Sequence, residues 1–111
     1  MYVEDAAEGL LRAVELYDDI EILNLGCGQG CSIRELAEIV RQEAGWPGSF
    51  VYDTQRPDGA PCKIIDVNKM KQVLGGWMPP TGLRAGIRRT IAWLLEHYEE
   101  SQAVAADRTL P

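Results

Sequence analysis

Histidine is nearly absent from the sequence, which contains only His97, and no two of the three cysteines form a C-x-x-C pair. A zinc site needs about four ligands, which are usually paired at short spacing. The sequence therefore gives no indication of a metal site. We expect Cys27, Cys31 and Cys62 to be structural or free thiols.

Long apolar runs and clusters of basic residues are also missing. No stretch approaches the roughly 20 apolar residues that cross a bilayer, and no charged and then apolar leader precedes Glu4. The net charge is −6 and lysine and arginine are scattered, whereas nucleic-acid binding proteins present a basic face. These features predict a cytoplasmic protein that binds neither nucleic acid nor membrane.

A chain of 111 residues with 46% hydrophobic composition has the size and content of one globular domain. After Ser101 the apolar residues no longer follow a helical period. We therefore expect one domain over residues 1–100 and a frayed tail over residues 101–111.

Apolar spacing predicts four helices. The first begins near Val3, and the second begins after Ser32, which forms a capping box with Glu35, and ends before Gly45. Asn68 and Thr81 are predicted to cap a short third helix and a long fourth one. In the first helix the apolar residues form one stripe that we expect to be buried: Ala6, Ala7, Leu10, Leu11, Val14 and Tyr17.

Three short segments, residues 21–25, 49–53 and 64–66, are predicted strands because they are rich in β-branched, aromatic and other apolar residues. Together the elements predict an α+β fold, or a small α/β fold, in which about four helices pack on a small sheet.

The glycine turn in "LNLGCGQG" (23–30) resembles motif I of the S-adenosylmethionine-dependent methyltransferases, and Asp53 follows Gly30 by 23 residues. However, Asn24 stands where that motif is usually acidic, and few further strand-helix units fit into the rest of the chain. A methyltransferase fragment is one interpretation. The alternative is that the glycines only permit a tight turn.

A second resemblance covers residues 2 to 100. The segments "YVEDAAEGLLRAVE", "EILNLGCGQGCSIRELAEIV", "FVYDTQRPDGAPCKIIDVNKMKQVLGGW" and "GLRAGIRRTIAWLLEHY" resemble, in order and spacing, the C-terminal lobe of extended short-chain dehydrogenase/reductases. This is the NAD-dependent epimerase/dehydratase family, whose members act on nucleotide sugars. Within it, the D-x-x-x-P-D-G-x-P-x-K-x-x-D pattern from Asp53 to Asp66 is most similar to the GDP-L-fucose synthase family.

The resemblance implies an NADPH-dependent 3,5-epimerase and 4-reductase that acts on GDP-4-keto-6-deoxymannose. Such enzymes carry a glycine-rich NADP loop and Ser, Tyr and Lys catalytic residues in a Rossmann lobe. Here no early G-x-x-G-x-x-G motif exists, and none of the four tyrosines has a lysine four residues later. We therefore expect a substrate-binding lobe alone, inactive by itself and without catalytic or cofactor residues. Its first helix follows Met1 without a capping residue, which suggests that a preceding segment has been removed.

The resemblance also assigns candidate ligand contacts. Asp58 aligns with an aspartate that contacts the nucleotide, although Pro-Asp-Gly is also a turn sequence. Lys63 is expected near the diphosphate, and Arg56 is a further candidate on its charge alone. The alternative for each is a solvated surface cation. Cys62 replaces an arginine of the family, and a thiol does not reproduce the bidentate contacts of a guanidinium.

A different class of function remains open. A lobe without its neighbour should expose an apolar face, so the chain is alternatively an interaction module that forms a homodimer or docks onto a partner.

Overall fold

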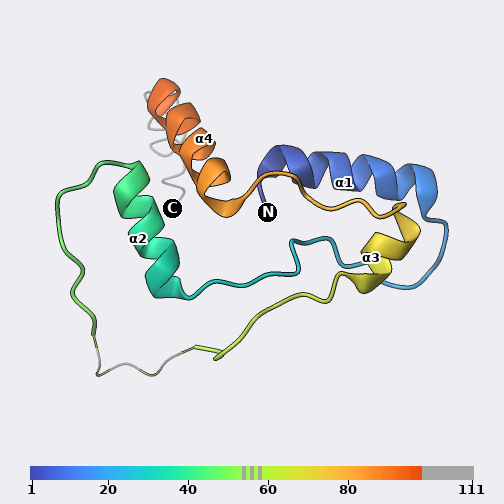
Figure 1. The fold of residues 1–111 in the computed structure, drawn as a ribbon, viewed down its shortest axis with the longest axis horizontal. Helices are drawn as coiled ribbons and strands as arrows, with labels where there is room; N and C mark the ends of the chain where they lie inside the picture. The colour runs from blue at the N-terminus through green and yellow to red at the C-terminus, as the bar shows by residue number, and fades with distance from the viewer. Residues whose placement is uncertain (54, 56, 58, 99–111) are drawn as a thin grey trace, which may run out of the picture.

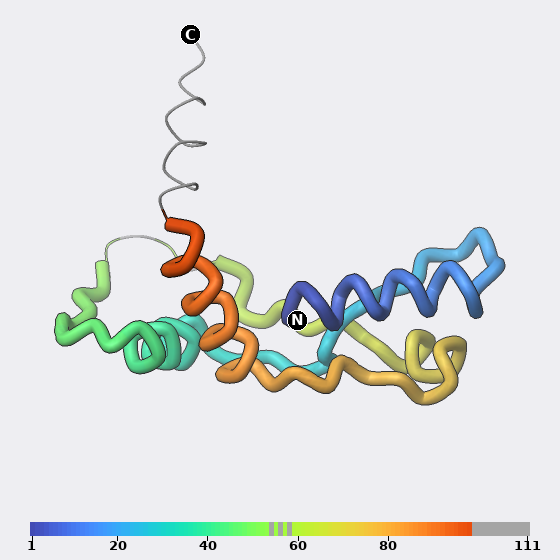
Figure 2. The backbone as a smooth tube through the Cα atoms, turned by 90° about the horizontal axis from the view of Figure 1, so that it is seen from above, coloured from blue at the N-terminus to red at the C-terminus, as the bar shows by residue number. Residues whose placement is uncertain are grey.

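The structure is a computed structural model that describes residues 1–53, 55, 57 and 59–98. Within these residues the elements are four helices: α1 (Val3–Leu16), α2 (Ile33–Glu43), α3 (Asn68–Val73) and α4 (Leu83–Glu96). α1 and α3 lie at one end of the molecule and α2 and α4 towards the other, with extended connections between the two ends (Figure 1). Figure 2 shows the same separation from a second direction.

The predicted sheet is absent from the described part of the chain. Residues 21–25, 49–53 and 64–66 form no strand, so the α+β prediction was wrong and the described fold is helical. A strand needs backbone hydrogen bonds to a neighbour, but outside the helices the described backbone bonds join residues no more than five positions apart. β-branched and apolar composition favours extended backbone without supplying a pairing partner.

The buried core lies on α3. Its buried apolar side chains are Val67, Met70 and Leu74. Met70 and Leu74 are fully covered and share one helical face because they are four residues apart. The side chains packed around them come from α1, from α3 itself, from the connection that follows α1 and from the connection that follows α3: Ala13, Leu23, Leu25, Val73, Trp77 and Met78. The core is therefore small and local to one end of the molecule.

α2 begins and ends as the sequence predicts. The Ser32 hydroxyl accepts a hydrogen bond from the Glu35 amide at 3.1 Å, and the Glu35 carboxylate accepts one from the Ser32 amide at 2.8 Å. At the other end Gly45 has a φ of +64°, and the Trp46 amide donates to the Arg41 carbonyl at 3.0 Å. This is the Schellman arrangement, in which a left-handed residue ends the helix.

The predicted caps of the other two helices were wrong. Asn68 is the first residue of α3 rather than its cap, and its amide donates to the Asp66 carboxylate at 2.9 Å. α4 begins after Gly82 without a side-chain cap. Thr81 instead donates from its amide and its hydroxyl to Asp5 of α1, each at 2.9 Å.

α1 buries the side opposite to its predicted stripe. Asp5 is 5% exposed, and the Trp77 ring lies where a side chain on Gly9 would be, 2.8 Å from that position. Leu11 and Val14, in contrast, are 63% and 84% exposed. The prediction of a buried stripe was therefore wrong for Ala7, Leu10, Leu11 and Val14, which are exposed, whereas Ala6 and Tyr17 are half-buried.

Candidate functional site

The segment from Asp53 to Asp66 lies on the surface. Its described residues, 53, 55, 57 and 59–66, are all exposed. At its start the Gln55 amide donates to the Asp53 carboxylate at 3.0 Å, which forms an Asx turn. Pro57 and Pro61 restrict the backbone further on. The segment therefore presents polar groups to solvent on a backbone with restricted freedom.

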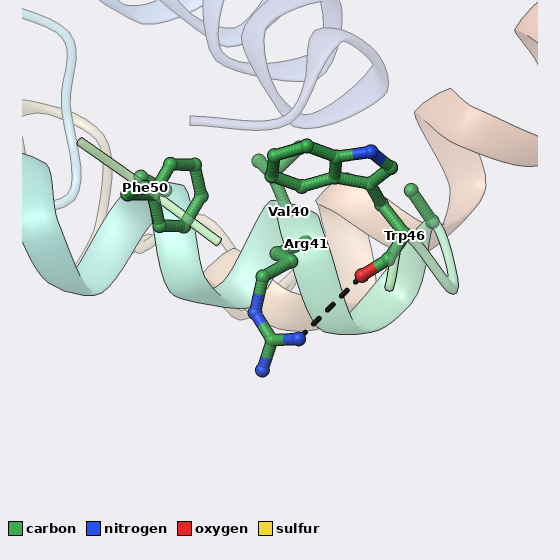
Figure 3. Close-up of a pocket in the computed structure, with 6 residues that line it drawn as sticks. Val40, Arg41, Trp46 and Phe50 are labelled. Carbon is green, nitrogen blue, oxygen red and sulfur yellow. Dashed lines mark hydrogen bonds between the residues drawn. The ribbon is translucent and has the colours of Figure 1, made fainter. Parts of the chain in front are cut away.

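Aromatic side chains attach the start of this segment to α2. The Arg34 guanidinium lies 4.6 Å from the centre of the Tyr52 ring, within the range of a cation–π contact. Further back, the rings of Trp46 and Phe50 are 5.6 Å apart. Both rings lie against α2 near Val40 (Figure 3) and border an open hollow of about 350 Å³.

The other end of the segment packs against the glycine turn. A Cβ atom built on Gly28 would lie 2.6 Å from Val67 Cγ2, and one built on Gly30 would lie 2.9 Å from Ile64 Cγ1. Gly28 also has a φ of +65°, which residues with a side chain rarely adopt. The glycines therefore allow the chain leaving residues 53–66 to approach the turn closely.

This packing decides between the interpretations of the glycine turn. In a dinucleotide or S-adenosylmethionine site the glycines would admit the cofactor, whereas here Val67 and Ile64 lie against them. The amides at a helix N-terminus bind anions when they are free, but the Glu35 amide of α2 already donates to the Ser32 hydroxyl. The residues of this turn fit neither NADP nor S-adenosylmethionine, and the tight-turn interpretation agrees with the structure.

The predicted ligand contacts are only partly described. Lys63 is exposed and immediately precedes Ile64, which packs on the glycine turn. Arg56 and Asp58 lie outside the described residues. Cys62 is exposed and is a free thiol.

The described residues contain no group of three or more His, Cys, Asp and Glu side chains arranged to hold a metal ion. None of their helices combines the length and the apolar character needed to cross a membrane.

An ion-pair group that the sequence analysis missed joins α2 to α4. Both carboxylate oxygens of Glu43 are paired, one with Arg84 at 2.6 Å and the other with Arg88 at 2.7 Å. The Glu43 side chain is only 9% exposed, and the bonds from Arg88 and Arg84 lower its pKa from the ordinary value of 4.5. These residues are more than 40 positions apart, so no local sequence signal could have found the pairing.

The sequence of the chain is similar to those of enzymes that act on nucleotide sugars, in particular GDP-L-fucose synthases. The chain is 36% identical over 97 residues to GDP-L-fucose synthase 1 of Arabidopsis thaliana, a match that covers 87% of this chain and 29% of that protein. It is 32% identical to GDP-L-fucose synthase of Escherichia coli K12 over 89% of this chain and 33% of the relative.

A third relative, GDP-L-fucose synthase of Sinorhizobium fredii, is 36% identical over 81% of this chain and 28% of its own length. The chain thus spans about a third or less of the relatives that it matches. No protein-family model matches it, and no solved structure does so. The resemblance to a fragment of GDP-L-fucose synthases, predicted from the sequence, is confirmed.

Proposed function

We propose that this chain provides the nucleotide-sugar binding part of an enzyme of the GDP-L-fucose synthase kind, and that residues 53–66 contact the GDP-sugar. The observation that carries the proposal is the similarity itself. A continuous match to 87% of a 111-residue chain has to include its middle, and therefore includes residues 53–66. The exposed, proline-restricted course of this segment supports the proposal, because binding loops keep polar groups available on a restrained backbone.

Each proposed contact follows from the chemistry of its side chain. The Asp58 carboxylate accepts hydrogen bonds from ribose hydroxyls or from the N–H edge of guanine. Lys63 and Arg56 donate to the diphosphate through charge-assisted hydrogen bonds. Cys62 supplies no such contact, so the diphosphate depends on the two remaining cations.

The proton and hydride transfers of the epimerase and reductase steps are proposed for the whole enzyme rather than for this chain. The glycine turn at residues 26–30 does not fit NADP, because the side chains of Val67 and Ile64 lie against it. We therefore assign NADP and the catalytic Ser, Tyr and Lys to the part of the relatives that lies outside the match. On this account the chain binds and orients the substrate.

A calorimetric titration of the chain with GDP and GDP-mannose, with UDP for comparison, tests the binding proposal. We expect saturable binding of both guanine nucleotides, weaker binding of UDP, and at least about a tenfold loss for Asp58→Ala, since a lost hydrogen bond to a charged group costs about 1.5–3 kcal/mol. Asp18→Ala is the matched control, because Asp18 is exposed and lies outside residues 53–66. Equal affinities for the two variants would contradict the assignment.

A further inference from the structure

Arg34 differs from the other arginines that the structure describes. Those side chains are each paired with a glutamate: Arg12 with Glu8, Arg41 with Glu38, Arg84 and Arg88 with Glu43, and Arg89 with Glu4. Arg34 is exposed, and within the described residues its guanidinium makes a ring contact, with Tyr52, rather than an ion pair. In a chain of net charge −6, an arginine without a carboxylate partner among the described residues is a candidate for binding an anion.

Arg34 lies where the two ends of residues 53–66 approach the start of α2. At the first end, its guanidinium lies 4.6 Å from the centre of the ring of Tyr52, the residue that precedes the segment. At the second end, Ile64 Cγ1 lies 2.9 Å from the position of a Cβ atom on Gly30, which is four residues before Arg34. One short stretch of chain, residues 30–34, therefore contacts both ends of the proposed binding segment, and Arg34 is the cation within it.

The contact with Tyr52 restrains Arg34 without using its hydrogen-bond donors. A cation–π contact acts through the face of the ring, whereas the N–H donors of a guanidinium point outward in its own plane. A side chain that is restrained before binding loses less conformational freedom when a ligand binds. The Arg34 guanidinium is therefore suited to bidentate recognition of a phosphate group.

Lys63 supplies a second cation near Arg34. It is exposed and directly precedes Ile64, which packs on Gly30. The four residues from Gly30 to Arg34 span at most about 14 Å, a separation that a lysine and an arginine side chain extending toward each other can shorten to the size of a small anion. A diphosphate has two linked anionic groups, so two cations that approach it from different segments match its charge.

We propose that Arg34 binds the diphosphate of the nucleotide sugar together with Lys63, and that Tyr52 positions the Arg34 guanidinium. This inference rests on the proposed function, because it adds a residue from α2 to the same site. Cys62 stands where the family resemblance places an arginine, and a thiol does not make the bidentate contact of a guanidinium. Arg34 supplies that contact from a different element.

Calorimetric titrations of the chain with GDP, and separately with inorganic pyrophosphate, test the inference. Pyrophosphate keeps the linked anionic groups and lacks the guanine and the ribose. We expect Arg34→Gln to weaken the binding of both ligands by about tenfold or more, because the lost hydrogen bonds are charge-assisted. Arg34→Lys should weaken it less, since the charge remains but the planar fork is lost.

Arg89→Gln is the matched control and should leave both affinities unchanged. Arg89 also lies over a tyrosine ring, 5.4 Å from the centre of Tyr2, but it is paired with Glu4 and belongs to α4. The comparison of the two variants therefore separates a specific contact of Arg34 from the loss of one positive charge anywhere on the surface.

The positioning role of Tyr52 is tested by two substitutions. Tyr52→Leu removes the aromatic ring and should weaken pyrophosphate binding by about threefold, whereas Tyr52→Phe keeps the ring face and should retain the affinity of the unsubstituted chain. Equal affinities of these two variants would refute the positioning role. Arg34 and Tyr52 are both exposed, so circular dichroism should show unchanged helix in every variant.

The two ligands separate this inference from the proposed function. GDP binding that Asp58→Ala weakens, but that Arg34→Gln and Arg89→Gln affect equally, would overturn the role of Arg34 and leave the proposed function standing. Binding of GDP and pyrophosphate that depends on Arg34 but not on Asp58 would support the diphosphate site and refute the proposed recognition of the nucleotide. Absence of binding for both ligands would overturn both proposals.

Discussion

Gly28 shows how a single residue determines the course of the chain. Its φ of +65° and the Val67 side chain beside it each disfavour any other residue. The three glycines that follow an apolar run therefore have a structural cause. They allow a close contact between two parts of the chain. A cofactor turn and a tightly packed turn have the same local requirement, so the sequence alone left both interpretations open.

Gly28→Ala should destabilise the fold by about 2 kcal/mol or more, because the new methyl group meets both backbone strain and Val67. Urea unfolding measures the effect. Gly59→Ala is the matched control, since a Cβ at Gly59 would meet nothing within 4 Å, and it should change stability by less than about 0.5 kcal/mol. Equal effects of the two substitutions would show that the glycine turn is not packed as described.

The Asp5–Thr81 pair is the second point at which individual residues hold distant segments together. Asp5→Ala should cost about 1.5–3 kcal/mol, because it leaves the Thr81 amide and hydroxyl without their acceptor. Thr81→Val removes only the hydroxyl bond and should cost about 1 kcal/mol. In the double variant the costs should be less than additive, and additive costs in urea unfolding would argue against the contact.

At the scale of the elements, the four helices could be predicted from the spacing of apolar residues. Their exact ends could be predicted only where the residues that fix the end are close to it in sequence. Ser32, Glu35 and Gly45 lie within one turn of the ends of α2, so their spacing was sufficient to predict them. Thr81 had the composition of a cap, but its hydrogen bonds go to Asp5, 76 positions away. The residues around a helix end do not show whether a distant side chain, here Asp5, will take the hydrogen bonds of a potential cap.

The contact between α2 and α4 should depend on pH through Glu43. Its pKa is lowered in the folded chain by Arg88 and Arg84, so its stabilising contribution is present above the ordinary pKa of about 4.5 and is lost as the pH falls through the lower folded value. At pH 7, Glu43→Gln should lower the melting temperature by roughly 4 °C. Below about pH 4 the difference from the unsubstituted chain should shrink.

Melting curves between pH 7 and pH 3 measure this dependence, with Asp18→Asn as the control for a carboxylate at an exposed position. A difference between Glu43→Gln and the unsubstituted chain that stays constant over this range would contradict the role of the ion pairs.

At the scale of the whole molecule, the resemblance to GDP-L-fucose synthases was predictable from ordered segments and the Pro-Asp-Gly pattern, whereas the sheet was not. Extended segments become strands only when other segments offer free backbone groups. Here Ile64, Ile65 and Val67 instead pack through their side chains against the glycine turn at residues 26–30. The exposure of Leu11 and Val14 on α1 belongs to the same scale, because their apolar spacing predicted a buried face and depends on distant segments for its cover.

The most direct test of the central claim is a nuclear magnetic resonance titration of the isotope-labelled chain with GDP-mannose. The account predicts that amide shifts change chiefly in residues 53–66, with Lys63 among them, and that Asp58→Ala suppresses these changes. Shifts confined to the glycine turn at residues 26–30, or no shifts at saturating ligand, would contradict the assignment of residues 53–66 as the nucleotide-sugar site.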